Sequence, residues 1–301
     1  MLTRIMLIAT TLLVAGAVPA AAAVLSDEPV QATAADEQVA SADGDHGYLS
    51  WSQNSAAHPG HYDAFVSLHG GAAVKVNRDG TSGWNGGIDG GRLIYQQVHN
   101  GQSDLRSFDL ASSTRTVPAG VNTLLWEWRP TISGDWILFG RVNTRTSPGQ
   151  GWVLLHNSVT GQTITLVHST SYSEPGQVNG DYATYMTCGN VACNVFRYQI
   201  SSGLRVKMPN PRLRIEYAPS VSSSGTVYYA SSGPACGLDA RIVSFTPGTS
   251  SVATLLVRLR DGVDLNTSYV DDHANGDRFL LHDRGLCGKH NQSIYRFIDP
   301  A

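Results

Sequence analysis

Short apolar runs, each preceded by a polar residue and a glycine, recur along the chain at a nearly constant spacing. The run TISGDWILFG at 131–140 has counterparts in GIDGGRLIYQ (87–96), QVNGDYATYM (177–186), SVSSSGTVYY (220–229) and HANGDRFLLH (273–282). The apolar residues that mark the units are Leu49, Leu93, Ile137, Ala183, Val227 and Phe279, at steps of 44, 44, 46, 44 and 52 residues. A period in the forties with strand-like units is typical of β-propeller blades.

The interior of each unit also reads as strands. The third unit contains EWRPTIS, DWILFGRV, GWVLLHNSV and QTITLV, which are short, rich in β-branched and aromatic residues, and separated by turn residues. No segment shows an apolar period of 3.6 residues long enough for a core helix. We therefore predict an all-β fold, a β-propeller of six four-stranded blades over residues 44–301, with the innermost strand just before each glycine turn.

The last unit is incomplete. It ends at SIYRFIDPA (293–301), after its third strand, and an open sheet edge is a liability that proteins avoid. The N-terminal segment before Gly47 is one possible source of the missing outer strand, which would join the first blade to the last. The alternative is a sixth blade that is simply short.

Two segments carry a recognisable repeat motif, RPTISGDWILF (129–139) and APSVSSSGTVYY (218–229). In these the chain resembles the TolB-like, WD40-like family of six-bladed β-propellers, whose repeats combine a proline, a Ser-Gly-Asp type turn and two strands. The resemblance covers residues 44–301. It implies the fold and an exported location. It implies no particular reaction, because the family includes binding scaffolds, accessory domains and a few enzymes.

The N-terminus predicts export. Residues 1–23 contain an early cation, a short apolar run and an alanine-rich end, the order of a secretory signal peptide; a transmembrane helix, the alternative, needs about 20 apolar residues. Residues 24–43 are acidic and lack periodicity, so we expect a disordered leader. The mature chain is thus expected to be secreted and without a membrane span.

The net charge of the chain bears on which partners it can bind. A formal net charge of −3 gives no electrostatic reason to expect a nucleic-acid partner.

Four cysteines in an exported chain predict disulfides. From their positions in the loops of the last three units we expect the pairs Cys188–Cys193 and Cys236–Cys287, one of three possible connectivities. Zinc ligation and redox catalysis are the alternatives, although the spacings fit neither pattern.

Acidic residues recur beside the predicted inner strands. They are Glu127, Glu174, Glu216, Asp271 and Asp272. If they pointed into the central channel, they would form a partial carboxylate ring that suits Ca²⁺. The alternative is that each pairs with a nearby arginine, such as Arg129 or Arg214.

Trp126 and Trp128 flank Glu127 at the start of a predicted inner strand. Exposed aromatic rings stack on sugars, so this WEW run is the strongest sequence indication of a glycan-binding surface. Buried packing between blades is the alternative reading of the same residues.

The leading hypothesis is a secreted, non-catalytic propeller that binds a protein or glycan partner outside the cytoplasm. No catalytic residue is assigned. The alternative is a carbohydrate-active enzyme, a polysaccharide lyase that uses His99, His282 or His290 with an arginine or tyrosine on the loop face. A third possibility is a structural propeller stabilised by calcium.

Overall fold

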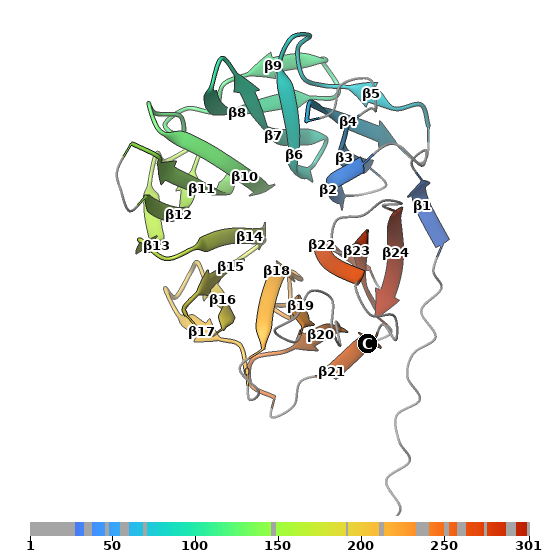
Figure 1. Ribbon diagram of the computed structural model, residues 1–301, viewed down its shortest axis with the longest axis vertical. Helices are drawn as coiled ribbons and strands as arrows, with labels where there is room; N and C mark the ends of the chain where they lie inside the picture. Colours follow the sequence, from blue (N-terminus) through green and yellow to red (C-terminus); the bar gives the residue numbers. More distant parts are fainter. Residues whose placement is uncertain are drawn as a thin grey trace, which may run out of the picture.

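The computed structural model describes residues 28–32, 38–45, 48–54, 60–68, 71–145, 149–190, 192–210, 214–232, 241–249, 253–257, 263–273, 276–286 and 293–299. Every regular element in these ranges is a β-strand, labelled β1 to β24. The prediction of an all-β fold is therefore confirmed. The strands form four-stranded antiparallel sheets arranged around a common centre, as in a β-propeller (Figure 1).

Five sheets, rather than the six predicted, are each built from four consecutive strands, ordered from the centre outward. Blade 1 contains β2 (Gln38–Asp45), β3 (Tyr48–Asn54), β4 (Tyr62–Leu68) and β5 (Val74–Lys75). Blade 2 contains β6 (Ser82–Asp89), β7 (Arg92–His99), β8 (Gln102–Asp109) and β9 (Thr114–Thr116). Blade 3 contains β10 (Trp126–Ser133), β11 (Trp136–Asn143), β12 (Gln150–Asn157) and β13 (Thr163–Ser169). Blade 4 contains β14 (Ser173–Asn179), β15 (Tyr182–Cys188), β16 (Cys193–Gln199) and β17 (Arg205–Lys207). Blade 5 contains β18 (Ile215–Val221), β19 (Val227–Ser232), β20 (Arg241–Phe245) and β21 (Ala253–Val257).

A further sheet, here called the composite sheet, joins the two ends of the chain. It contains β22 (Val263–His273), β23 (Gly276–Leu286), β24 (Ser293–Asp299) and, as its outer strand, β1 (Glu28–Ala32). In Figure 1 the blue strand β1 lies beside the red strand β24. The two strands pair antiparallel, with Glu28 opposite Arg296 and Ala32 opposite Ser293. The missing outer strand of the last unit is thus supplied from the N-terminal segment.

This arrangement corrects the expectation of a disordered leader at 24–43. Residues 28–32 form β1, and the innermost strand of blade 1 begins at Gln38. The composition of this segment is poor for strands, but its backbone finds partners in β24 and β3. Pairing with an available sheet edge outweighs the weak local preference of small and acidic residues.

The recurring polar residue before each glycine connects neighbouring blades. Asp45 Oδ2 accepts a hydrogen bond from the backbone N–H of Gly90 at 2.8 Å, and Asp89 Oδ2 accepts one from Gly134 at 2.5 Å. Ser133 Oγ accepts one from Gly180 at 3.0 Å. In each case the side chain at the end of one inner strand binds the glycine that follows the next inner strand. The repeated motif is therefore a contact between blades as well as a turn.

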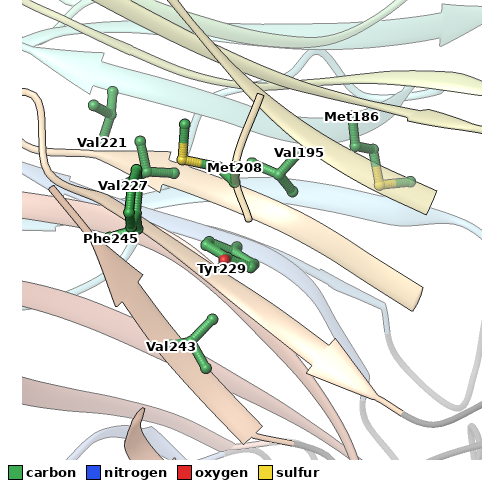
Figure 2. Packing of buried hydrophobic residues seen from close by; sticks show 8 residues of the cluster. All are labelled: Met186, Val195, Met208, Val221, Val227, Tyr229, Val243 and Phe245. Atoms are coloured by element: carbon green, nitrogen blue, oxygen red, sulfur yellow. The ribbon is translucent and has the colours of Figure 1, made fainter. Parts of the chain in front are cut away.

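Apolar side chains fill the space between blades. Figure 2 shows one such cluster between blades 4 and 5, formed by Met186, Val195, Met208, Val221, Val227, Tyr229, Val243 and Phe245, all buried. Burial of each large apolar side chain contributes about 1.5–3 kcal/mol. Equivalent clusters lie between blades 1 and 2, 2 and 3, and 3 and 4. Each of blades 1 to 5 is therefore packed against at least one neighbouring blade by a buried apolar cluster.

The expected signal peptide at 1–23 lies outside the described residues. Within the part of the chain that the structure describes, no helix is long and apolar enough to cross a membrane.

Candidate recognition surface on the loop face

One end of the propeller, called the loop face here, is where the inner strands of blades 2 to 5 begin. In a four-stranded meander the turn between the second and third strands lies at this same end. The loop face therefore carries the β7–β8, β11–β12 and β15–β16 turns, together with the crossover segments 117–125 and 170–172. Loops on a rigid scaffold are the usual place for binding residues.

Glu127, the second residue of β10, is completely buried at this end. Its Oε1 accepts hydrogen bonds from Arg141 Nε at 2.8 Å and from Thr123 Oγ1 at 2.6 Å. Arg141 also donates to the carbonyl oxygen of Val121, 2.6 Å away. The carboxylate is thus fixed within blade 3 and its incoming crossover, where no external ligand reaches it.

Glu174, the second residue of β14, is also buried but pairs across blades. It forms an ion pair with Arg129 of blade 3 and accepts a hydrogen bond from the Tyr172 hydroxyl at 2.8 Å. The expected alternative, pairing of these glutamates with arginine, is confirmed for Glu174 with Arg129. For Glu127 the partner is Arg141, which the sequence did not single out.

Glu216, the second residue of β18, occupies the same strand position without such an ion pair. Its side chain is buried, and Oε2 accepts a hydrogen bond from the backbone N–H of Val195 at 3.3 Å. Burial raises the pKa of Glu216 to about 8, although the Val195 N–H and the charges of Lys207 and Arg214 act in the opposite direction. This carboxyl group is therefore largely protonated at neutral pH.

The acidic residues of the predicted carboxylate ring lie at opposite ends of their inner strands. Asp271 and Asp272 lie at the far end of their inner strand, opposite Arg278 and Asp277 and next to the β22–β23 turn. The three glutamates lie at the starting end of theirs, and all three are buried. Among the described residues no group of three or more histidine, cysteine, aspartate or glutamate side chains is arranged to hold a metal ion.

Exposed apolar and aromatic side chains gather beside these buried glutamates. Leu124 is 77% exposed in the crossover before β10, and Tyr172 is 55% exposed just before β14. The ring centres of Trp128 and Tyr172 are 6.5 Å apart. The Arg129 guanidinium lies over the Trp128 ring, 5.7 Å from its centre.

We call Leu124, Trp126, Trp128, Arg129 and Tyr172 the recognition surface. Sequence reasoning identified Trp126 and Trp128, both of which are partly buried, but not Leu124 or Tyr172 as surface residues. A signal for Tyr172 was present, because Trp84, Trp128 and Tyr172 follow one another at steps of 44 residues. The buried Glu127 and Glu174 support this surface from below rather than contribute to its exposed area.

Arg129 has an unusual backbone conformation for a residue with a side chain. Its φ angle is +46°, at the point where the register of β10 against β11 shifts between Trp128 and Thr131. Ala218 has a φ angle of +48° at the equivalent register shift of β18. Such conformations cost about 1–3 kcal/mol and persist where the surroundings impose them. The bulge directs the Arg129 side chain toward the next blade.

The predicted disulfide Cys188–Cys193 is present at the β15–β16 turn. Cys188 and Cys193 are directly opposite each other in register, which brings their side chains together. Cys236 and Cys287 lie outside the described residues, so their pairing stays a prediction.

Of the three histidines in the lyase hypothesis, the structure describes the surroundings of His99 alone. His99 is exposed at the β7–β8 turn. His282 is a residue of β23 and is in register with Ile294 of β24, and His290 is outside the described residues.

No family model and no curated protein sequence matches the chain. Solved structures do. TolB from Acinetobacter baumannii aligns with a TM-score of 0.58 and 14% identity, over 83% of this chain and 63% of that one. The acylaminoacyl peptidase of Pyrococcus horikoshii aligns with a TM-score of 0.55 and 9% identity, over 82% of this chain and 43% of that one. An oligogalacturonate lyase from Vibrio parahaemolyticus aligns with a TM-score of 0.52 and 12% identity, over 88% of this chain and 79% of that one.

These likenesses show the fold. The chain spans less than two thirds of the TolB and peptidase structures. At such low identity the residues of a site are not comparable position by position. The chain is a β-propeller with TolB among its structural neighbours.

Proposed function

We propose that the chain is an exported, non-catalytic β-propeller that binds a protein partner through the recognition surface. The composite sheet serves as the sixth blade. The signal peptide predicted at 1–23 and the Cys188–Cys193 disulfide support export, because disulfides persist in oxidising compartments.

The observation that carries the proposal is the composition of the recognition surface. Tryptophan, tyrosine and arginine dominate the binding energy of protein interfaces, and Arg129 and Tyr172 are both substantially exposed. Leu124 adds an exposed aliphatic side chain. The neighbouring carboxylates of Glu127 and Glu174 are already neutralised by arginine, so a partner need not compensate a buried charge there.

The surroundings of the Trp128 ring favour a protein partner over a glycan. A sugar ring stacks on an open aromatic face, but the Trp128 ring has the Arg129 guanidinium over it and Tyr172 beside it. Its indole nitrogen is buried, and this nitrogen has no hydrogen-bond partner within the described residues. Trp128 therefore supports Arg129 and Tyr172 rather than offering a free stacking platform.

The test is site-specific photo-crosslinking in the cells that produce the protein. A photoreactive amino acid replaces Leu124 on the recognition surface or, as a matched control, Leu204, which is 53% exposed at the β16–β17 turn on the opposite end of the propeller. We expect a defined protein adduct from position 124 and none from position 204. The adduct should be lost in the Arg129→Ala and Tyr172→Ala variants.

Two results would contradict this proposal. Equal adducts from both positions would show that the surface has no preference for a partner. Saturable binding of a purified polysaccharide, reduced by Tyr172→Ala and accompanied by no protein adduct, would show that the partner is a glycan.

A polysaccharide lyase remains the second candidate. One of the structural neighbours is an oligogalacturonate lyase that aligns with most of this chain. The two candidates separate in one measurement, the ultraviolet absorbance of the unsaturated product during incubation with polygalacturonate. A steady rise that His99→Ala or His282→Ala abolishes would favour the lyase.

A further inference from the structure

The Cys188–Cys193 disulfide is connected to the recognition surface by a continuous series of contacts. The backbone N–H of Cys188 donates a hydrogen bond to the carbonyl oxygen of Tyr172, 2.8 Å away. The Tyr172 hydroxyl donates to Glu174, and Glu174 pairs with Arg129.

The disulfide and this hydrogen bond lie on either side of the same strand. Cys188 is the last residue of β15, which lies between β14 and β16. On one side the Cys188 N–H closes the end of the β14–β15 ladder through Tyr172. On the other side its sulfur closes the end of the β15–β16 ladder through Cys193. Both ladders therefore end at one residue.

The turn that the disulfide closes is exposed to solvent. Gly189 and Asn190 are exposed, and both cysteines are partly exposed. One backbone hydrogen bond, from the Gly189 N–H to the Ala192 carbonyl oxygen at 2.9 Å, spans the turn between the cysteines. A reductant therefore has access to the sulfurs.

We propose that this disulfide positions Tyr172, and that its reduction is a redox switch for the recognition surface. Reduction converts the S–S bond into two thiols by taking up two electrons and two protons from a dithiol, which becomes a disulfide. The end of β15 then frays, the Tyr172 carbonyl loses its donor, and the tyrosine ring is no longer held beside Trp128. The inference rests on the proposed function of the surface.

The chain offers a matched pair of variants. Cys188→Ser with Cys193→Ser removes the disulfide at the recognition surface, whereas Cys236→Ser with Cys287→Ser leaves it in place. Hydrogen–deuterium exchange on the unliganded chain then reports on residues 170–174 and 186–190. Because no partner is added, this experiment can fail without bearing on whether the surface binds a protein.

We expect faster exchange in both segments in the first variant and wild-type exchange in the second. For a loop of about six residues the chain-entropy model gives an acceleration of up to roughly 40-fold. The wild-type chain treated with dithiothreitol should reproduce the first variant, and the first variant should not respond to dithiothreitol.

Acceleration confined to 186–190, with unchanged exchange at 170–174, would overturn the proposal, because the disulfide would then hold only its own turn. If the serine variant does not fold, the comparison of oxidised and reduced wild-type chain gives the same information. Unchanged exchange on complete reduction, verified by thiol labelling of Cys188 and Cys193, would also overturn it.

Discussion

At the scale of single residues, three glutamates at one strand position behave differently because of their partners. Glu127 has Arg141 within its own blade, and Glu174 has Arg129 from the neighbouring blade. Glu216 has a backbone N–H instead, and burial raises its pKa. The residue type is the same in all three blades, whereas the group that contacts each carboxyl differs from blade to blade.

Glu216 predicts a pH dependence of stability. Its pKa rises from 4.5 in the unfolded chain to about 8 in the folded one. Between these values the unfolded state loses a proton that the folded state keeps, so the free energy of unfolding decreases as pH rises from about 4.5 to 8. We expect Glu216→Gln to match the wild type near pH 4 and to be more stable by roughly 3–5 kcal/mol at pH 8.

Urea denaturation of both proteins across this range is the measurement, with Glu127→Gln as the control. The control variant leaves Arg141 without its carboxylate and should be less stable than the wild type at pH 8. Parallel stability curves for Glu216→Gln and the wild type would mean that Glu216 is ionised in the folded chain.

The Glu127–Arg141 pair gives a second prediction at this scale. The Arg141 side chain is 18% exposed and Glu127 is fully buried, so removal of the arginine leaves a carboxylate without compensation. We expect Arg141→Met to lower the free energy of unfolding by about 3 kcal/mol at pH 7. The double variant Arg141→Met, Glu127→Leu should recover much of this loss. No recovery would show that packing, rather than the buried charge, causes the destabilisation.

At the scale of elements, the contacts between inner strands explain the regular spacing of the repeat. Asp45, Asp89 and Ser133 each bind a glycine N–H in the following blade, 45 or 47 residues further along the chain. Thr131 and Gln177 make similar bonds to Val178 and Val221, 47 and 44 residues on. The side chain must offer an oxygen atom that accepts a hydrogen bond, which serine, threonine, aspartate and glutamine all do.

Loss of one such bond has a predictable effect. Ser133→Ala removes the acceptor for the Gly180 N–H and should lower the free energy of unfolding by about 1 kcal/mol. The exposed Thr116 in the outer strand β9 is the control, and Thr116→Ala should change stability by no more than about 0.5 kcal/mol. Equal effects of the two substitutions in chemical denaturation would mean that the contact between blades contributes nothing specific.

At the scale of the whole molecule, the propeller depends on how the ring is closed. The outer edge of the composite sheet is covered by a strand from the other end of the chain, with Glu28, Pro29, Gln31 and Ala32 in register with β24. The recognition surface lies on blades 3 and 4, which pack directly against each other through a buried apolar cluster.

Removal of β1 tests this closure. A chain beginning at residue 34 lacks β1 and leaves the edge of β24 unpaired. With about 1 kcal/mol lost for each of several backbone hydrogen bonds, the free energy of unfolding should fall by roughly 3 kcal/mol. The melting temperature should then decrease by about 6–12 °C relative to a chain beginning at residue 24. An unchanged melting temperature in calorimetry would show that β1 is dispensable for closure.

The sequence by itself determined the architecture, because the same structural unit is encoded several times along the chain and its repetition is visible in the sequence. A period near 44 residues and strand-like runs between glycine turns are local features, and every blade shows them, so the all-β propeller was predictable. The Cys188–Cys193 bridge was predictable for the same reason, since a tight hairpin brings its two ends together.

Only the tertiary structure decided what the polar side chains do. The sequence placed Glu127, Glu174 and Glu216 at equivalent positions. The ion pairs of Glu127 and Glu174 depend on Arg141 and Arg129, which are positioned by strand register and by a bulge. It suggested a carboxylate ring, yet Asp271 and Asp272 lie at the other end of their strand. The sequence does not distinguish Leu124 and Tyr172 from other loop residues, and only the folded structure shows that both side chains are exposed. The periodicity of the strands depends on residues that are close together in the sequence. A binding surface depends on side chains that are distant in the sequence and meet only after folding.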